Sequence, residues 1–309
     1  MDFDRIVVVK RATQLEELLQ RHATASQARF YLESRGESYS SYHDAHNDYQ
    51  KGVSGTVSAI PKSMRSQVVE KSLLPTYKFL EKDLVVVVGD PGLFVNVAKY
   101  AQGQTIIVVN PDNARFDDTF TICRPETFRK CLEDTLGGKT GLEEITMAEA
   151  VLEDGQSMLA LNDIYIGRNS HASARYRIEH GKKAEMQSSD GILVSTGAGS
   201  TGWLTSIMVG AYALVGGEPC PLERVVFPRD SNYLAFTVMN PFPSRTTGTS
   251  VIRGRATQSE PLKVVSQMPE NGVIFSDGIE SDYLEFTAGK TATIRPAYQK
   301  ACLVRWQAR

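Results

Sequence analysis

Two short, almost wholly apolar segments separated by a helical stretch constrain the fold most strongly. Residues 84–88 read LVVVV, residues 105–109 read TIIVV, and the stretch around Phe94 to Tyr100 between them has helical spacing. Strands that are apolar throughout are buried on both faces, as in parallel sheets covered by helices. Strand, helix and strand in this order therefore predict a βαβ unit in a parallel sheet.

Neighbouring segments extend this pattern to a whole domain. The apolar run Ile6–Val9 predicts another buried strand, and residues 14–21 (QLEELLQR) have the spacing of an amphipathic helix. A stripe of aromatic and apolar side chains between Glu37 and Ile60 predicts one face of a long helix. A further helix, from Arg124 to Thr135, is expected to close this domain.

The character of the sequence changes after Leu161. Short alternating runs separated by turn residues predict a mainly β second domain. These runs are residues 163–167, 174–178, 192–195, 234–238, 262–265 and 291–294. We therefore expect a protein of the α/β class, with a Rossmann-like α/β domain over residues 1–148 and a mainly β, sandwich-like domain over residues 149–309. A return of the last residues, about 20 of them, to the first domain is left open.

The composition narrows the class of protein and its partners. Of the 309 residues, 41% are hydrophobic and 23% charged, which is typical of a soluble globular protein. A formal net charge of -2 gives no electrostatic basis for binding nucleic acid or an anionic membrane. No apolar run is long enough for a transmembrane helix, and the opening MDFDRIVVVK leaves no room for a signal peptide. We expect a cytoplasmic protein without nucleic-acid or membrane partners.

Residues that could bind a metal lack suitable partners. The four cysteines show no CxxC pairing, which fits a reducing compartment and argues against a zinc site. A packing or surface role is expected for His43 and His46, because a pair of histidines is by itself a poor signal for a metal site. The sequence therefore predicts no metal ligands.

The segment VVVVGDPGLF, Val85 to Phe94, is the first candidate for chemistry. It is a predicted strand that turns through glycine, aspartate and proline into a helix. Ligands of open α/β sheets bind beyond the carboxyl ends of the strands, where helix N-termini favour phosphate. Asp90 could hold magnesium or accept a proton there, or it could simply cap the helix beside turn residues. Both interpretations stay open on this segment alone.

The segment LNDIYIG, Leu161 to Gly167, is the second candidate. The pair Asn162 and Asp163 stands directly before a predicted strand and could offer an amide and a carboxylate to the hydroxyl groups of a ligand. Asn-Asp pairs more often make turns, so this segment is weak evidence by itself.

The third candidate is SSDGILVSTGAGSTGW, Ser188 to Trp203. Small and hydroxyl residues here separate a predicted strand from a predicted helix, for which Ser200 or Thr201 could be the N-cap. Gly197 and Gly199 would let the backbone approach a ligand, whereas a tight turn needs only one glycine. The helix presents a stripe that we expect to face the core: Trp203, Ile207, Met208, Ala211, Leu214 and Val215.

Together these segments resemble the NAD kinase family. DGILVSTGAGSTGW is similar to that family's DG-(apolar)-STPTGSTAY segment, and LNDIYIG to its Leu-Asn-(Glu/Asp) segment. VVVVGDPGLF lies where the family has a Gly-Gly-Asp-Gly-Thr loop, and IIVVNPD (106–112) resembles the GVN strand end that follows. FSDGIE (275–280) matches a late Asp-Gly turn. Order and spacing agree over nearly the whole chain, and the flanking residues are most similar to the divergent mitochondrial type of NAD kinase.

The resemblance implies an activity and a place for it. Members of the family transfer the γ-phosphoryl group of ATP, with Mg²⁺ or another divalent cation, to the 2′-hydroxyl of the adenosine ribose of NAD. The product is NADP, and the active site lies in the cleft between the two domains. Family members are usually homo-oligomers, so a homodimer or a higher homo-oligomer is expected.

By position, the resemblance also assigns roles to residues of this chain. Asp90 would be the proton acceptor. The phosphate loop would contain Gly89, Pro91 and Gly92. The residues that bind NAD would be Asn162, Asp163, Asp190 (at the nicotinamide end), Ser200, Thr201, Gly202 and Trp203. Asp277 lies in the late Asp-Gly turn.

The phosphate loop departs from the family pattern, and the departures leave two alternatives. Val88 replaces the first glycine of the loop, Pro91 the glycine after the aspartate, and Gly92 the threonine. Pro91 has no N–H to offer a phosphate, and Gly92 has no hydroxyl. One alternative is a non-catalytic member that binds dinucleotide as a sensor or regulatory partner. The other is a kinase with a different hydroxyl acceptor.

Overall fold

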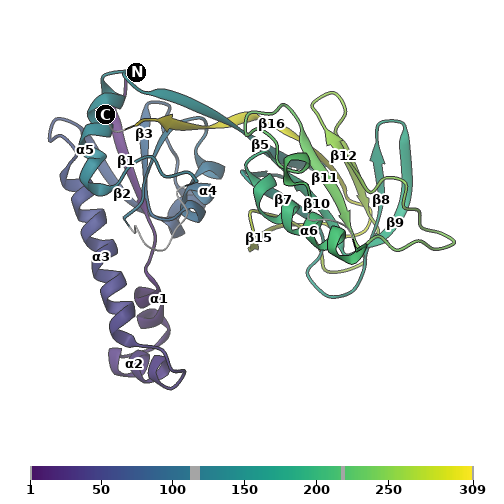
Figure 1. Cartoon of the computed structure of the whole chain (residues 1–309), viewed down its shortest axis with the longest axis horizontal. Coiled ribbons are helices and arrows are strands. Elements are labelled where there is room, and N and C mark those ends of the chain that lie inside the picture. The colour runs from purple at the N-terminus through teal and green to yellow at the C-terminus, as the bar shows by residue number, and fades with distance from the viewer. Residues whose placement is uncertain (1, 112–118, 217–219, 308–309) are drawn as a thin grey trace. The chain divides into compact units, whose positions relative to one another are not determined.

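The computed structural model describes residues 2–111, 119–216 and 220–307, and these form two compact units (Figure 1). Met1–Glu143 with Cys302–Arg309 make the first unit, and Glu144–Ala301 make the second. Two strands, β5 (Gly141–Leu152) and β16 (Thr291–Arg305), each run from one unit into the other. The chain therefore enters the second unit along one strand and leaves it along another.

The first unit is a parallel sheet with helices on both faces. Its strands are β1 (Arg5–Lys10), β2 (Arg65–Glu70), β3 (Asp83–Val88) and β4 (Thr105–Val109). Its helices are α1 (Gln14–Arg21), α2 (Ala25–Glu33), α3 (Tyr39–Ser58), α4 (Pro91–Tyr100) and α5 (Pro125–Leu136). The strand order is β2-β1-β3-β4, and Cys302 and Leu303 of β16 pair in parallel with β4.

The core of this unit explains why its strands are apolar throughout. Helices α3 and α5 cover one face of the sheet, and α4 lies on the other (Figure 1). Tyr49 and Val53 of α3 and Phe128 of α5 belong to one buried cluster with alternate residues of the strands, such as Val86 and Ile107. Every residue of β3 and β4 is buried, which confirms the predicted parallel sheet.

The strand order also marks where a ligand can bind. From β1 the chain goes to β2 on one side, and then to β3 on the other side of β1. Open α/β sheets bind ligands beyond the carboxyl ends of the strands at such a topological switch point. The residues that follow β1 and β3 there are Arg11 and Gly89–Asp90.

The second unit is a β-sandwich, as the alternating runs predicted. One sheet has the order β12-β11-β10-β7-β14-β15, and the other contains β13, β8 and β9 with the unit's parts of β16, β5 and β6. The remaining strands are β6 (Ser157–Ala160), β7 (Asp163–Arg168), β8 (Ala174–His180), β9 (Lys183–Ser189), β10 (Gly191–Ser195), β11 (Leu234–Met239), β12 (Arg253–Ala256), β13 (Leu262–Ser266), β14 (Gly272–Ser276) and β15 (Ile279–Glu285). Side chains from both sheets, including Tyr176, Phe236 and Phe286, form one core. The unit's helix is α6 (Trp203–Leu214).

Several elements of the fold were not predicted, among them strands β9, β12, β14 and β15 of the second unit. Strand β2 is mostly exposed and polar, so it lacks the apolar run that identified its neighbours. Helix α2 buries only Ala28 and Leu32. Strands β5 and β6 precede Leu161, so the β structure begins before the change in sequence character. No helix in the described part of the chain is both long and apolar enough to cross a membrane.

Candidate active site

The loop after β3 carries the residues predicted to handle phosphate. The N–H of Gly89 donates to the carbonyl of Val109 at 3.0 Å. Asp90 is the N-cap of α4, and its Oδ1 accepts the N–H of Leu93 at 2.9 Å. Pro91 and Gly92 are the first two residues of the helix. The interpretation of Asp90 as a helix cap is thus correct. The capping hydrogen bond occupies one of the two carboxylate oxygens, Oδ1.

The second oxygen of Asp90 faces a cation that the sequence analysis missed. Arg11 directly follows β1, and its Nε lies 2.9 Å from Asp90 Oδ2 in an ion pair. The two side chains keep 29% and 19% of their surface exposed. A basic residue at the carboxyl end of a parallel strand was the available signal, because that end of the sheet is where ligands bind.

Tyr49 of α3 ties the two strand ends together beneath this ion pair. Its hydroxyl accepts the backbone N–H of Arg11 at 3.0 Å and donates to the carbonyl of Val88 at 2.8 Å. Burial raises the pKa of Tyr49 to about 12, against the opposing effect of Arg11. The phenol therefore keeps its proton near neutral pH and remains a hydrogen-bond donor.

A cavity of about 1150 Å³ opens beside this loop. Arg11, Gly89 and Asp90 line it together with His46 and Tyr49 of α3. This volume slightly exceeds the roughly 300–1,000 Å³ of most small-molecule sites, so a nucleotide can be accommodated. The last residue of the IIVVNPD segment, Asp112, lies outside the described residues.

The two histidines of α3 have ordinary local partners. His46 Nδ1 lies 2.9 Å from the hydroxyl of Thr13, and His43 Nδ1 lies 3.1 Å from the side-chain nitrogen of Asn47. Within residues 2–111, 119–216 and 220–307, no group of three or more His, Cys, Asp or Glu side chains could hold a metal ion.

In the second unit, Asp277 binds the segment that contains Asn162 and Asp163. Asp277 and Gly278 have φ values of 54° and 72°, and they form the turn between β14 and β15. The carboxylate of Asp277 accepts three consecutive backbone N–H groups, from Leu161 (3.1 Å), Asn162 (2.7 Å) and Asp163 (3.2 Å). The structure thus brings together two predicted segments that are distant in the sequence.

Asp163 is a buried acid with an unusual environment. Its residue surface is only 8% exposed, and Oδ1 has no hydrogen-bond partner among the described residues. Burial raises the pKa of Asp163 to about 7, a hydrogen bond from the Ser195 side chain lowers it, and the charge of Asp277 raises it further. Asp163 therefore holds its proton up to about neutral pH.

This raised pKa predicts a pH dependence of stability. Between the pKa of an unfolded aspartate, about 3.9, and the folded value, the folded state binds the additional proton. Stability should therefore fall as the pH rises from about 4 to about 7. In Asp163→Asn, this contribution should disappear, so denaturant unfolding at several pH values should show a flatter profile than that of wild type. Identical profiles would exclude a raised pKa for Asp163.

The glycines of the STGAGST segment pack against the chain itself. A Cβ at Gly197 would overlap the carbonyl of Pro228, and one at Gly199 would overlap the carbonyl of Asn162. The prediction that these glycines expose backbone to a ligand is therefore wrong. They are needed because the segment lies so close to its own neighbouring backbone.

This packing changes what Gly199→Val should do. We expect a loss of about 1–3 kcal/mol in the free energy of unfolding, because overpacking a close backbone contact forces the neighbouring chain to move. Affinity for NAD should fall together with stability, because the displaced carbonyl is that of Asn162, which the resemblance assigns to NAD binding. Gly210→Val is the control, since a Cβ at Gly210 meets nothing within 4 Å. Thermal melting with calorimetric titration of NAD measures both effects, and weaker binding at wild-type stability would contradict this interpretation.

The residues at the start of α6 divide into buried and exposed ones. Ser200 is buried, and its hydroxyl donates to the carbonyl of Gly197 at 2.8 Å and accepts the N–H of Phe227 at 3.3 Å. The N-cap of α6 is Gly202, without a side-chain hydrogen bond, so the prediction of Ser200 or Thr201 as N-cap is wrong. A short 3-10 helix, Gly199–Thr201, precedes it and displaces the cap by one residue or more. Thr201 and Gly202 are exposed.

An aromatic surface lies beside these exposed residues. The ring of Trp203 stacks on that of Tyr165, with centroids 5.9 Å apart and an interplanar angle of 12°. The hydroxyl of Tyr165 donates to the backbone carbonyl of Asp190 at 2.8 Å. The carboxylate of Asp190 accepts the side-chain N–H of Asn240 at 2.6 Å. Tyr165, which the sequence analysis did not single out, thus connects Trp203 with Asp190.

The predicted core-facing stripe of α6 is only partly correct. Ile207 and Met208 pack against a small buried cluster around Leu204. Leu214 and Val215, by contrast, are 88% and 81% exposed. The last turn of this apolar helix extends beyond the cluster, so its side chains lie on the surface.

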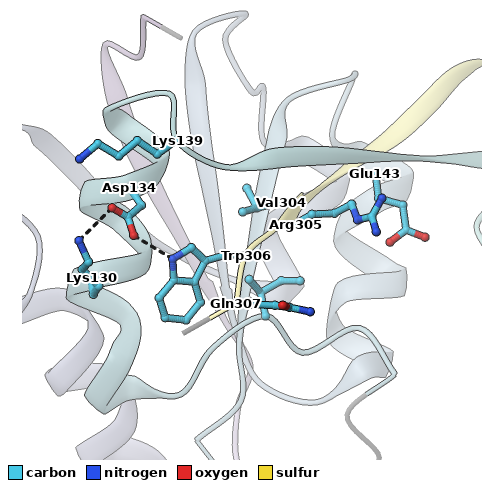
Figure 2. A pocket seen from close by; sticks show the side chains of 9 residues that line it. Lys130, Asp134, Lys139, Glu143, Val304, Arg305, Trp306 and Gln307 are labelled. Atoms are coloured by element: carbon cyan, nitrogen blue, oxygen red, sulfur yellow. Dashed lines mark hydrogen bonds and ion pairs between the residues drawn. The ribbon is translucent and has the colours of Figure 1, made fainter. Parts of the chain in front are cut away.

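A second cavity in the first unit contains none of the predicted site residues. It has a volume of about 970 Å³ and lies between α5 and the end of β16. Figure 2 shows Lys130 and Trp306 converging on Asp134, with distances of 3.0 Å from Asp134 to each. These two hydrogen bonds, that of Trp306 first, lower the pKa of Asp134. The contacts attach the C-terminal segment to α5.

Among solved structures, the chain shares its two-part fold with dinucleotide kinases. An NAD kinase from Archaeoglobus fulgidus, solved in complex with ATP, matches with a TM-score of 0.57 at 16% identity. The match covers 97% of this chain and 92% of that one. A yeast NADH kinase complexed with NADH matches with a TM-score of 0.62 at 14% identity, over 99% of this chain and 85% of that one. At this identity the likeness shows the fold.

In sequence, the chain is similar to several bacterial NAD kinases. The NAD kinase of Aquifex aeolicus is 27% identical over 190 residues, 60% of this chain and 64% of that protein. Those of Cupriavidus pinatubonensis and Heliobacterium modesticaldum are 31% and 32% identical over 146 and 144 residues, 45% and 44% of this chain. The chain spans less than two thirds of these relatives, 44% and 47% of the latter two. No model of a protein family matches it. The chain is thus similar to NAD kinases in sequence and shares the fold of an NAD kinase and an NADH kinase.

Proposed function

We propose that the protein transfers the γ-phosphoryl group of ATP to the 2′-hydroxyl of the adenosine ribose of NAD, giving NADP and ADP. The main observation behind this proposal is that the Asp90 carboxylate lines a cavity at the topological switch point of the parallel sheet. The similarity of the chain to NAD kinases supports the same reaction. Phosphoryl transfer depends mainly on positioning and charge stabilisation, so one carboxylate and a metal-bound donor suffice. We also propose that the chain belongs to the divergent mitochondrial type of NAD kinase.

The proposed step moves one proton and one phosphoryl group. The 2′-oxygen of the ribose attacks the γ-phosphorus, the bond to the bridging oxygen of ADP breaks, and the hydroxyl proton passes to Asp90 Oδ2. Oδ1 stays on the N–H of Leu93, which holds the carboxylate in place. Arg11 must share or release Oδ2 during this transfer, because the two atoms are in contact now.

Magnesium would arrive with the nucleotide. In such sites Mg²⁺ is bound through one or two carboxylates and the phosphates of the substrate. Asp90 is the carboxylate of the loop that could contact the ion, and this chemistry fits its partly exposed position. The cation would neutralise charge that develops on the transferred group.

For the dinucleotide, we propose a division of roles in the second unit. Thr201, Gly202 and Trp203 are exposed and would contact NAD, and Asn162 and Asp190 would offer polar groups to it. Asp163, Ser200 and Asp277 would act by holding these residues in place, because their polar atoms are buried or bound to backbone.

We further propose that the protein is cytoplasmic and forms a homodimer or a higher homo-oligomer. The support for assembly is the exposed apolar end of α6, where Val209, Leu214 and Val215 are at least 47% exposed. Exposed apolar patches of this kind commonly mark protein interfaces. Sedimentation at several protein concentrations tests the assembly, and a monomer at every concentration would exclude it.

The activity is tested by incubating the protein with NAD and MgATP and assaying NADP with an NADP-specific dehydrogenase. Formation of NADP, and its loss without Mg²⁺ or ATP, is the expected result. NADH and polyphosphate, offered in parallel, define the preferred acceptor and donor. Binding of NAD without any product would favour the non-catalytic alternative. Phosphorylation of another hydroxyl compound in place of NAD would favour the alternative of a kinase with a different acceptor.

A further inference from the structure

Arg11 occupies the point of the first unit where a ligand of a parallel sheet is expected. It follows the last residue of β1, and its Nε lies 2.9 Å from Asp90 Oδ2 across the switch point. Both residues line the cavity of about 1150 Å³ beside the loop. A cation in a cavity at this end of a sheet is suited to an anionic ligand.

The structure holds this arginine in place from several sides. Its guanidinium carbon lies 5.4 Å from the centre of the Tyr49 ring, and Nη1 donates to the carbonyl of Ala12 at 3.2 Å. Its backbone N–H donates to the hydroxyl of Tyr49. Arginine has five N–H donors in a planar fork, so these contacts leave others for a ligand. Lys51, which also lines the cavity, is 79% exposed and pairs with Asp48.

The neighbouring helix start offers few donors to a phosphate. Pro91 has no N–H, and the N–H of Leu93 is bound to Asp90. Of the first three residues of α4, only Gly92 therefore keeps a backbone N–H for a ligand, and it has no side chain. A phosphate at this helix needs a donor from elsewhere, and Arg11 is next to it.

We propose that Arg11 binds the terminal phosphates of the donor nucleotide and replaces the donors that are missing at Pro91 and Gly92. This rests on the proposed function for the identity of the nucleotide, but not for the binding of its phosphates. A guanidinium that turns from a carboxylate to a phosphate exchanges one oxyanion for another, and either can accept two parallel N–H bonds. Its movement frees Asp90 Oδ2, so that binding of the donor prepares the carboxylate to take a proton.

The test is calorimetric titration of MgATP without NAD, using Arg11→Gln, Arg11→Lys and a control. Lys10→Gln is the control, because it removes the same charge one residue earlier but from a side chain that pairs with Glu70. Arg11→Gln should weaken binding about tenfold or more, the loss expected for a hydrogen bond to a charged group. Arg11→Lys should be intermediate, and Lys10→Gln should match wild type. In turnover, the KM for ATP should rise in Arg11→Gln while the KM for NAD stays constant.

A restored loop should compensate for the missing arginine. Pro91→Gly with Gly92→Thr returns an N–H and a hydroxyl to the loop. A Cβ at Gly92 would lie 3.1 Å from Asp90 Oδ1, so the carboxylate must move by a few tenths of an ångström. This double change should strengthen MgATP binding in the Arg11→Gln background and have little effect in wild type. A purely structural role of Arg11 would predict no such rescue.

The outcomes separate this inference from the proposed function. A folded Arg11→Gln variant that binds MgATP as tightly as wild type overturns the inference, and so does a wild-type protein that does not bind MgATP. Binding that depends on Arg11, in a protein that makes no NADP, supports the inference and rejects the proposed function. Formation of NADP, with a KM for ATP that is unchanged in Arg11→Gln, supports the proposed function and overturns the inference.

Discussion

Replacing Asp90 with asparagine should slow NADP formation by about 100- to 10,000-fold, because an amide cannot take the proton that a general base removes. The fold should persist. Asparagine is as good an N-cap as aspartate and can still accept the N–H of Leu93. What is lost is a partly exposed ion pair with Arg11, which contributes about 1 kcal/mol or less. Steady-state turnover and thermal melting measure the two effects.

The control for this variant is Asp44→Asn. Asp44 lines the same cavity, so the change removes a charge of the same sign nearby without touching the loop. Its turnover should equal that of wild type. Turnover of Asp90→Asn within a few-fold of wild type would show that Asp90 is an N-cap and an ion-pair partner, and not the base.

The kinetics can also separate two roles of Asp90. A base acts in the transition state, so its loss lowers kcat with little change in KM. If Asp90 acted only by positioning Arg11, the variant would instead raise the KM for ATP, as Arg11→Gln should. Both roles would fall on Oδ2, which contacts Arg11 and is the oxygen proposed to take the proton, whereas Oδ1 accepts the N–H of Leu93. We therefore expect a large fall in kcat together with a smaller rise in the KM for ATP.

The fold could be predicted where burial leaves a clear pattern. Strands β3 and β4 are buried on both faces, so they are apolar throughout and easily recognised. Strand β2 lies at the edge of the same sheet with most of its residues exposed, and it carries no such pattern. The register of a parallel sheet and the order of its strands depend on contacts between distant residues. The switch point beside Asp90 therefore appears only in the structure.

The site was predictable in its residue types but not in its contacts. A glycine-rich segment shows that something lies close to the backbone, but it does not show whether this is a ligand or the chain. At Gly199 it is the carbonyl of Asn162. Arg11 was missed for a related reason, since its partner Asp90 is far away in the sequence. Asp277 was found through its Asp-Gly turn, but the backbone that its carboxylate binds was not.

Removal of the Asp277 carboxylate should strongly lower the free energy of unfolding. Its carboxylate accepts three consecutive backbone N–H groups, from Leu161 to Asp163. A hydrogen bond to a charged group contributes about 1.5–3 kcal/mol, so removing the side chain should cost on the order of 4 kcal/mol in the free energy of unfolding. Asp277→Gly is the best variant, because glycine adopts the φ of 54° without strain and the loss then reports the hydrogen bonds.

Two further variants make this result specific. Asn271→Gly is the control, since Asn271 also has a positive φ, 58°, and the change introduces the same backbone freedom in another loop. It should cost about 1 kcal/mol or less. Asp277→Asn keeps one acceptor oxygen and tolerates a positive φ, so its loss should be intermediate.

Denaturant unfolding gives the total loss, and hydrogen exchange locates it. In Asp277→Gly the amides of Leu161, Asn162 and Asp163 should exchange much faster than in wild type, since their acceptor is gone. Affinity for NAD should also fall in this variant, because Asn162 would no longer be held in one position. Unchanged exchange at these three amides, together with a stability within about 1 kcal/mol of wild type, would show that the carboxylate does not hold this segment. Faster exchange with unchanged affinity for NAD would instead remove Asn162 from the proposed dinucleotide site.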